Sequence, residues 1–414
     1  MSRAAAGGLA RALPVVGVLA IGTLPADAGA ARWTLENSFE ARAETNDNVT
    51  LQPNPPGTVN TRYLSAAMNA TRSMENSASR VDATLTSVDQ DGGGEDRLDG
   101  RLGWSQTLAG PLDTFKLGAG LTQDFNDAVA SADVALGRGR RRATTLSGAW
   151  SRALSERWSA SGQIAWSGTR YGSAPSAGTD FRNTALSGGL SYRVTEVDSV
   201  SLQASRSEYR SLDGASRSSS ASLDVSVARA LSERMSSSLG LGVYRTENAV
   251  LGLRRACPLA VSLCEAGIVP WVVYLDRSAS TGQGLQYDSS YRYQLSETTS
   301  VAFATGSRQT PSGAGTVVRG ETLTLDLGHA FSETLTGRAG YASARSRYQR
   351  IDGSTRAAQR SIGLTLSKRL AVDVGLEASF EHTRAELPGA GARAHANRVG
   401  VSLRFDWPRL DATR

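Results

Sequence analysis

Long hydrophobic runs are missing from this 414-residue sequence. Beyond the first 30 residues, no segment has about 18 consecutive uncharged apolar residues, the length that a membrane-spanning helix needs. The longest apolar run, Ala12 to Leu24, is too short to span a membrane comfortably and lies near the N-terminus. We therefore expect no transmembrane helix.

The first 30 residues have the pattern of a secretory signal peptide. Arg3 and Arg11 supply positive charge before and at the start of the apolar run. Two triplets of the small-x-small type follow it, at residues 26–28 and 28–30, and either can serve as a cleavage site. We predict a cleaved signal peptide over residues 1–30 and one exported domain over residues 31–414.

Histidine is scarce, with three residues in the chain. His329 shares the apolar face of its segment, and we interpret it as a lipid-side residue near an interface. His382 and His395 flank a polar loop, with Glu381 and Glu386 nearby. They form either a metal or base site or, as we expect, part of a solvated loop. Nothing resembles the catalytic arrangements of membrane lipases, acyltransferases or proteases, so we predict no enzyme, no cofactor and no metal site.

Lysine occurs only at Lys116 and Lys368, and arginine supplies the other positive charges. The formal net charge of +6 is small and scattered, so it does not indicate nucleic-acid binding. The most basic stretch, Gly137 to Arg142, could contact phosphates of lipopolysaccharide or could be the solvated end of a loop.

Only two cysteines are present, Cys257 and Cys264. In an exported protein that meets an oxidising compartment, we expect a short disulfide between them. The residues around them are more apolar than an exposed loop should be. This loop could fold into a lumen as a constriction, pack on another subunit, or lengthen its flanking strands above a membrane.

Apolar residues alternate with polar residues or glycine through several segments. Leu325 and Leu327 share one face of such a segment, while Asp326 lies on the other. A period of two is typical of β-strands, because successive side chains point to opposite faces of a sheet. Clear examples of this alternation are residues 223–231, 321–331, 372–380 and 397–407.

Short polar turns recur between these segments at a period just under forty residues. Near-copies of one turn place glutamates at Glu156, Glu196, Glu233, Glu297 and Glu333. Longer stretches rich in Gly, Pro, Asn, Asp and Ser lie between them. We interpret each repeat as a hairpin with a tight turn and a long loop, and count about 18 strands, with 16 to 20 within the error.

Each predicted strand has only one apolar face. A soluble sandwich could use such strands, but about 18 of them in hairpins fit a closed barrel better, since closure removes every sheet edge. We predict an all-β, transmembrane, antiparallel up-and-down barrel with short periplasmic turns and longer extracellular loops. Its apolar face would point to lipid and its polar face to the lumen. The candidate pore-lining residues are Asp224, Asp326, Asp373, Glu377, Arg398, Arg404 and Asp406.

The last alternating segment, from Asn397 to Trp407, resembles the final strand of Gram-negative outer-membrane barrels. The resemblance implies a location in the outer membrane, contact with its lipid and lipopolysaccharide, and recognition by the barrel-assembly machinery. The chain departs from that pattern in continuing for seven residues after Trp407. Two further stretches, Phe39 to Asn54 and residues 118–127, look like parts of the porin-like barrels associated with exopolysaccharide and PEP-CTERM systems.

These patterns favour a porin-like channel for diffusion or export of polar solutes. The alternative is a barrel that serves as an accessory or scaffold for exporting a surface exopolysaccharide, and an enzyme barrel comes third. The same architecture is compatible with a homo-oligomer.

Overall fold

The computed structural model describes residues 31–413, except 56, 92–95, 127–138, 173–177, 260, 313–315, 351–352 and 387–392. The predicted signal peptide lies outside the described residues. The wall strands are β1 (Arg32–Asn46), β2 (Val59–Met74), β3 (Ser77–Gln90), β4 (Arg97–Ala109), β5 (Asp113–Asn126), β6 (Gly139–Ala153), β7 (Trp158–Tyr171), β8 (Phe181–Arg193), β9 (Asp198–Ser211), β10 (Ser216–Ser232), β11 (Met235–Ala256), β12 (Val272–Gln294), β13 (Thr299–Ser312), β14 (Thr316–Ala330), β15 (Leu335–Arg350), β16 (Gly353–Arg369), β17 (Val374–Glu386) and β18 (Arg393–Asp406). A short helix, α1 (Val261–Glu265), and a short strand, β19 (Leu410–Thr413), complete the fold.

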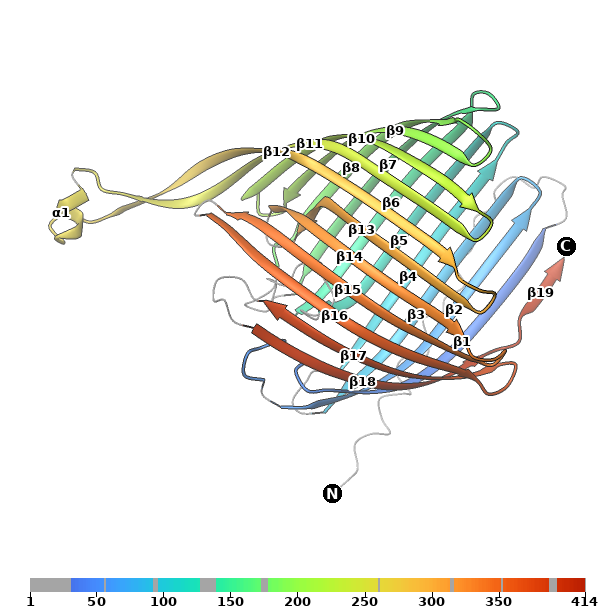
Figure 1. Ribbon diagram of the computed structural model, residues 1–414. Helices are drawn as coiled ribbons and strands as arrows, with labels where there is room; N and C mark the ends of the chain where they lie inside the picture. Colours follow the sequence, from blue (N-terminus) through green and yellow to red (C-terminus); the bar gives the residue numbers. More distant parts are fainter. Residues whose placement is uncertain are drawn as a thin grey trace, which may run out of the picture.

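The 18 wall strands form one closed antiparallel barrel, in which each strand pairs with its neighbours in sequence (Figure 1). Closure comes from β1, which pairs with β2 on one side and with β18 on the other. Because the sheet closes on itself, backbone N–H and C=O groups of the wall find partners without water, as a membrane-spanning sheet requires. The predicted fold class and the count of about 18 strands are confirmed.

The chain beyond Trp407 continues the closing seam. β19 pairs with the first residues of β1, from Arg32↔Thr413 to Leu35↔Leu410, on the same edge that β18 occupies further along. Arg409 lies 3.7 Å from Glu36 and Arg32 lies 3.6 Å from Asp411, so ion pairs accompany the backbone pairing. The tail that departs from the usual barrel pattern therefore lengthens the last strand after a short interruption.

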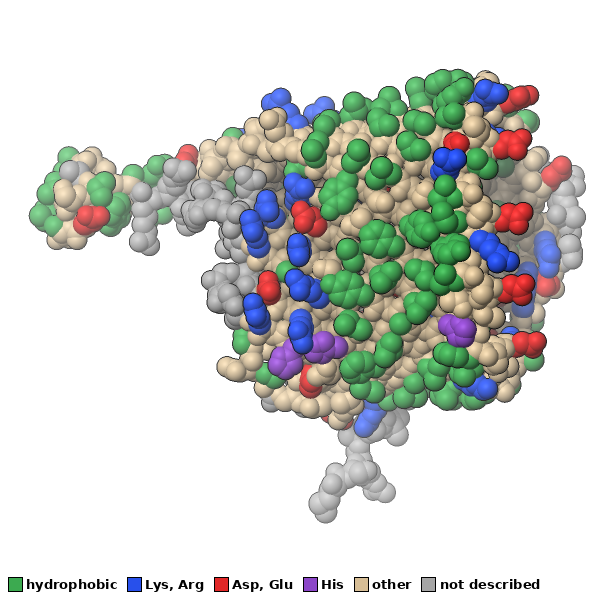
Figure 2. Space-filling view, viewed as in Figure 1, with side chains coloured by type: hydrophobic (Ala, Val, Ile, Leu, Met, Phe, Trp, Pro, Cys, Tyr) green, Lys and Arg blue, Asp and Glu red, His purple; other side chains and the backbone are tan. Residues whose placement is uncertain are grey.

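Large apolar side chains cover the outside of the barrel. On β10, Leu223, Val225 and Val227 are 45–47% exposed, although they belong to the middle of a long strand. Figure 2 shows such side chains as a band over the visible face, with charged side chains gathered on both sides of it. A band of this kind is unfavourable in water and stable against acyl chains, so the outer face is that of a membrane barrel. Within the described residues, no helix is long and apolar enough to cross a membrane.

Connections at the two ends of the barrel differ in length. One end carries short turns, and the repeated glutamates Glu156, Glu196, Glu233, Glu297 and Glu333 all lie in them. The other end carries the longer connections, such as those of residues 47–58, 172–180 and 257–271. In the 212–215 connection, the Ser211 side chain and the Ala215 N–H hold the pKa of the Asp213 carboxyl below its ordinary value. The repeated turn glutamates thus mark one end of the barrel, whereas the connections at the other end vary in length, and the one at 212–215 has only four residues.

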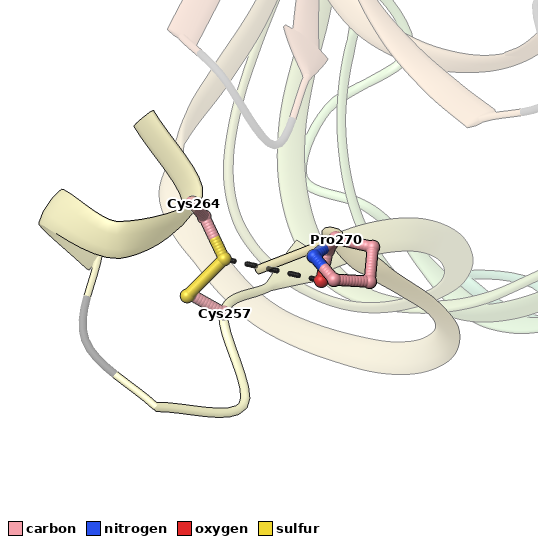
Figure 3. Close-up of a disulfide and its surroundings, with 3 residues drawn as sticks. All are labelled: Cys257, Cys264 and Pro270. Carbon is pink, nitrogen blue, oxygen red and sulfur yellow. Dashed lines mark hydrogen bonds between the residues drawn. A yellow bond between two sulfur atoms is a disulfide. The ribbon is translucent and has the colours of Figure 1, made fainter. Parts of the chain in front are cut away.

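The cysteine-containing segment forms the tip of an arm. β11 and β12 pair from Met235↔Tyr293 to Ala256↔Val272, well beyond the length of the other hairpins, and α1 lies at the far end, away from the barrel wall (Figure 1). Cys257 and Cys264 form a disulfide there. The carbonyl oxygen of Pro270 lies 3.9 Å from Sγ of Cys264 (Figure 3), a contact without a shared proton because a disulfide sulfur has none. Of the three expected arrangements, the structure has the lengthened strands. The prediction that this loop constricts the lumen is wrong, because the strands on both sides keep pairing and carry the loop outward.

Pairing between β12 and β13 stops early. Only the stretch from Tyr287↔Ser307 to Gln294↔Ser300 is paired, although β12 begins at Val272. Beyond Ser307, the end of the β13–β14 hairpin bends inward and leaves the β13-side edge of the arm without a neighbour among the described strands. At the long-loop end, the β11–β12 arm therefore extends away from the barrel, whereas the end of the β13–β14 hairpin turns into the lumen.

Candidate functional site

The inner wall of the barrel carries the charged side chains that the alternation predicted. Leu325 and Leu327 face outward and are 44% and 43% exposed, so Asp326 between them faces the lumen. By the same alternation, the structure places six of the seven candidate residues on inward positions: Asp224, Asp326, Glu377, Arg398, Arg404 and Asp406.

Asp373 departs from this expectation. It lies in the 370–373 turn, one residue before β17 begins at Val374, and its carbonyl oxygen accepts the N–H of Asp406 at 2.8 Å. The neighbouring Val372 is 99% exposed, so it belongs to the turn as well. The expectation that Asp373 lines the wall is corrected. The period-two pattern continues through the turn residues, but the strand does not.

A charged network crosses three strands on the lumen side of the closing seam. Arg398 on β18 forms ion pairs with Glu381 on β17 and with Glu44 on β1, where the closest atoms to Glu44 are 3.9 Å apart. Glu44 also pairs with Arg42 at 2.6 Å, and the guanidinium of Arg42 lies 5.6 Å from the ring centre of Tyr63. Both signs of charge therefore alternate along the wall within a few ångströms.

Glycines make room for lumen carboxylates. In the row Asp224↔Gly242↔Gln286, the side-chain amide of Gln286 donates to Asp224 across the glycine of the strand between them. Asp288 lies across from Gly240, and a Cβ there would come within 2.7 Å of its carboxylate. The glycines at 240 and 242 therefore decide where these acidic side chains lie.

The connection between β1 and β2 enters the long-loop end of the lumen. Leu51 in this loop is 1% exposed and packs with the small inward residues Ala385, Ala394 and Ala396. Asn48 fixes the loop by donating its side-chain amide to the carbonyl oxygens of Gln52 and His395, both at 2.8 Å. The loop therefore narrows the mouth along the closing seam.

The end of the β13–β14 hairpin narrows the mouth from another side. Ser220 of β10 donates to Oε1 of Gln309 at 2.9 Å, and Thr246 of β11 donates to the same oxygen. Tyr209 of β9 is 1% exposed and donates its hydroxyl to the carbonyl oxygen of Ser312 at 3.2 Å. Ser220, Thr246 and Tyr209 occupy inward positions of their strands, so this hairpin end lies against the lumen wall.

The alternation of apolar and polar residues does not predict these mouth contacts. Gln309 belongs to a polar stretch that reads as the start of a loop, and its partners lie 63 and 89 residues away. Leu51 offered a signal, since it is a single large apolar residue in a loop of Asn, Pro, Gln and Gly. Glu44, Arg42 and Glu381 lie at inward positions of their strands, and the alternation could have identified them.

The histidines lie on the outer surface of the barrel. His329 is near the short-turn end, where its Nδ1 is 2.8 Å from Thr299 Oγ1 and its ring meets Phe331 edge to face. His382 and His395 share the outward alternation of Phe380 and Val399. The residues with described positions contain no group of three or more side chains suited to hold a metal ion.

These observations define a class. A closed barrel with an even number of strands, an apolar outer band and a charged inner wall is a β-barrel of the bacterial outer-membrane type. The chain is therefore an outer-membrane β-barrel.

Comparisons with known proteins identify similar solved structures but no family. No family model matches the sequence, and no curated protein matches it. Among solved structures, OccAB3 of Acinetobacter baumannii is similar with 12% identity and a TM-score of 0.45, covering 92% of this chain and 100% of that one. OpdK of Pseudomonas aeruginosa, solved with vanillate, has 12% identity and a TM-score of 0.47, covering 90% and 99%. OpdQ of Pseudomonas aeruginosa has 10% identity and a TM-score of 0.48, covering 91% and 98%. These scores lie below 0.5, so the assignment to a class depends on the strands, the band and the lumen described above.

Proposed function

We propose that the chain forms a passive, porin-like channel for small polar solutes across the outer membrane. The observation that supports it best is the inverted polarity of the wall, with leucines outward and Asp326, Glu381 and Arg398 inward. Barrels of about 16 to 18 strands leave an aqueous lumen. Charged groups that face such a lumen act on whatever solute passes.

The mouth contacts would set the size and the opening of this channel. The β1–β2 loop with Leu51 and the β13–β14 end with Gln309 are held to the wall by a few hydrogen bonds and small apolar contacts. Contacts of this size break and reform easily compared with a strand ladder. We propose that they make the channel fluctuate between narrower and wider states.

The test is conductance of the refolded protein, without residues 1–30, in planar bilayers. The proposal predicts discrete current steps. Absence of steps from protein that is folded, as judged by circular dichroism and resistance to protease, would contradict an open channel.

Matched variants sharpen the test. Asp326→Asn removes a lumen charge, whereas Glu208→Gln removes a charge from an outward position of β9, where Glu208 pairs with Arg210 at 2.7 Å. We expect the reversal potential in a salt gradient to shift toward anion preference for Asp326→Asn and to stay unchanged for Glu208→Gln. Equal effects of the two variants would mean that Asp326 does not line the conducting path.

The outward face of β18 supports a second proposal, that the barrel-assembly machinery recognises this strand. Val399, Val401 and Leu403 are 48–51% exposed, and the rings of Phe405 and Trp407 meet edge to face with centres 5.9 Å apart. The polysaccharide-accessory role, the enzyme barrel and the homo-oligomer stay predictions from sequence, because no described feature favours them.

A further inference from the structure

A cluster of outward-facing basic side chains lies beside the apolar band on β16, β17 and β18. Arg360, Arg384 and His395 are directly opposite one another across these three strands, and all three are exposed. They line a groove of about 600 Å³, whose only acidic side chain, Glu386, lies 3.8 Å from Arg393. Neither Arg360 nor Arg384 forms an ion pair with any carboxylate of the described residues.

Two arginines directly opposite each other repel. Opposed side chains in an antiparallel pair have Cβ atoms about 5 Å apart, and like charges at that separation destabilise the sheet. The chain does not place a carboxylate between Arg360 and Arg384. An external anion with several oxygens, such as a phosphate, would relieve the repulsion and could accept hydrogen bonds from both guanidinium groups.

A chain of hydrogen bonds fixes Arg384. Its Nε donates to Nε2 of His382 at 3.1 Å, and Nδ1 of His382 is 2.7 Å from Oδ1 of Asn397. An arginine can only donate, so Nε2 of His382 is the acceptor and Nδ1 carries the proton given to Asn397. The Asn397 amide in turn donates to Asp47 at 2.7 Å. These bonds hold the Arg384 side chain in place and leave its terminal nitrogens free for a ligand.

An apolar groove lies further along the same three strands. The row Ile362↔His382↔Asn397 lies two residues further along the strands than Arg360 and Arg384. The apolar row Leu364↔Phe380↔Val399 lies two residues beyond that row. The apolar row lines a groove of about 450 Å³ on the same outer face. At about 3.3 Å per residue, the cationic and apolar rows are about 13 Å apart along the strands. Along the strands, the outer face therefore carries charged, then mainly polar, then apolar side chains. A phosphorylated lipid has the same order, from its phosphate to its acyl chains.

We infer that the outer face of β16–β18 binds a phosphate-bearing acylated lipid of the outer leaflet, with its phosphate between Arg360 and Arg384 and an acyl chain along Leu364, Phe380 and Val399. Long connections of such barrels face the cell exterior, so the cationic row lies at the level of outer-leaflet headgroups. In a bacterial outer membrane, lipid A supplies acyl chains and phosphates together. The site does not depend on whether the lumen conducts.

The experiment titrates the full mature protein in detergent with bis-phosphorylated lipid A and measures bound lipid by native mass spectrometry. The Arg360→Gln/Arg384→Gln double variant should bind at least about tenfold more weakly, since each charge-assisted contact is worth a several-fold change. The control Arg206→Gln/Arg245→Gln also removes two outward arginines. Ala221 lies between these two arginines, and Arg245 already pairs with Glu247 at 3.0 Å. The control should bind lipid A as the unaltered protein does.

Two further arms identify the ligand. The unaltered protein should bind lipid A without phosphates about as weakly as the double variant binds phosphorylated lipid A. Inorganic phosphate at equal concentration should not displace lipid A. Equal binding by the double variant and the control would overturn the site. Displacement by inorganic phosphate would overturn the lipid assignment. Unchanged resistance to protease and unchanged conductance of the double variant would show that the barrel and its channel are intact.

Discussion

Gln286 and Asp224 are joined by a hydrogen bond although a whole strand lies between them. Asp224 belongs to β10 and Gln286 to β12, and the residue of β11 in the same row is Gly242. A Cβ on Gly242 would collide with the Asp224 carboxylate. The Asp224 carboxylate can therefore occupy its position because residue 242 has no side chain.

Gly242→Ala should break this bond and destabilise the barrel by about 2 kcal/mol, since a hydrogen bond to a charged group is worth roughly that much. Urea unfolding in lipid vesicles measures the change. Gly375→Ala is the matched control, because a Cβ on this wall glycine meets nothing within 4 Å. Equal loss of stability in both variants would contradict a specific role for Gly242.

Gln309→Ala should loosen the β13–β14 end by removing the oxygen that Ser220 and Thr246 share. We expect a larger mean conductance or more frequent transitions between conductance levels, because the hairpin end would leave the wall more often. The control is Gln203→Ala, which removes a glutamine from an inward position of β9 that bridges no hairpin. Single-channel traces identical to those of the unaltered protein would show that the hairpin end does not limit the mouth.

Reduction of the Cys257–Cys264 disulfide should expose the arm tip to protease and leave the barrel unaffected. The disulfide joins two cysteines that are seven residues apart in sequence and lie far from the wall, so its loss frees the tip alone. Limited proteolysis with and without reductant should give a new cut within residues 257–271. The circular dichroism spectrum and the conductance should not change. A loss of β structure on reduction would contradict an arm that is independent of the barrel.

Truncation after Trp407 should leave a closed barrel of lower stability. The chain would lose the β19 pairing with β1 and the ion pairs of Arg409 and Asp411, but it would keep the nine β1–β18 pairs from Ser38↔Asp406 to Asn46↔Arg398. Exposed ion pairs contribute little, so the backbone pairs should account for most of a loss of about 1–3 kcal/mol. Thermal unfolding followed by gel mobility measures it. Failure of the truncated chain to form a barrel would show that β19 is needed for closure.

The sequence predicted the barrel because its evidence is local. Alternation such as Leu325–Asp326–Leu327 and the repeated turn glutamates depend only on neighbouring residues, and both follow from the geometry of strands and hairpins. Contacts that narrow the mouth are not local. Leu51 meets Ala385 and Ala394 across the closing seam, and Gln309 meets Ser220 only because its hairpin bends inward. Periodicity does not contain this information, and it also ran past the true strand boundary at Asp373.

One face of each wall strand meets lipid and the other meets the aqueous lumen. Single cysteines placed in turn at residues 323–327 of β14, in a Cys257→Ser/Cys264→Ser background, test it most directly in lipid vesicles. Positions 324 and 326 should react with a charged, water-soluble thiol reagent, while fluorophores at 323, 325 and 327 should be quenched by brominated acyl chains. Uniform reactivity along the five positions, or quenching at 326, would contradict this division of the two faces.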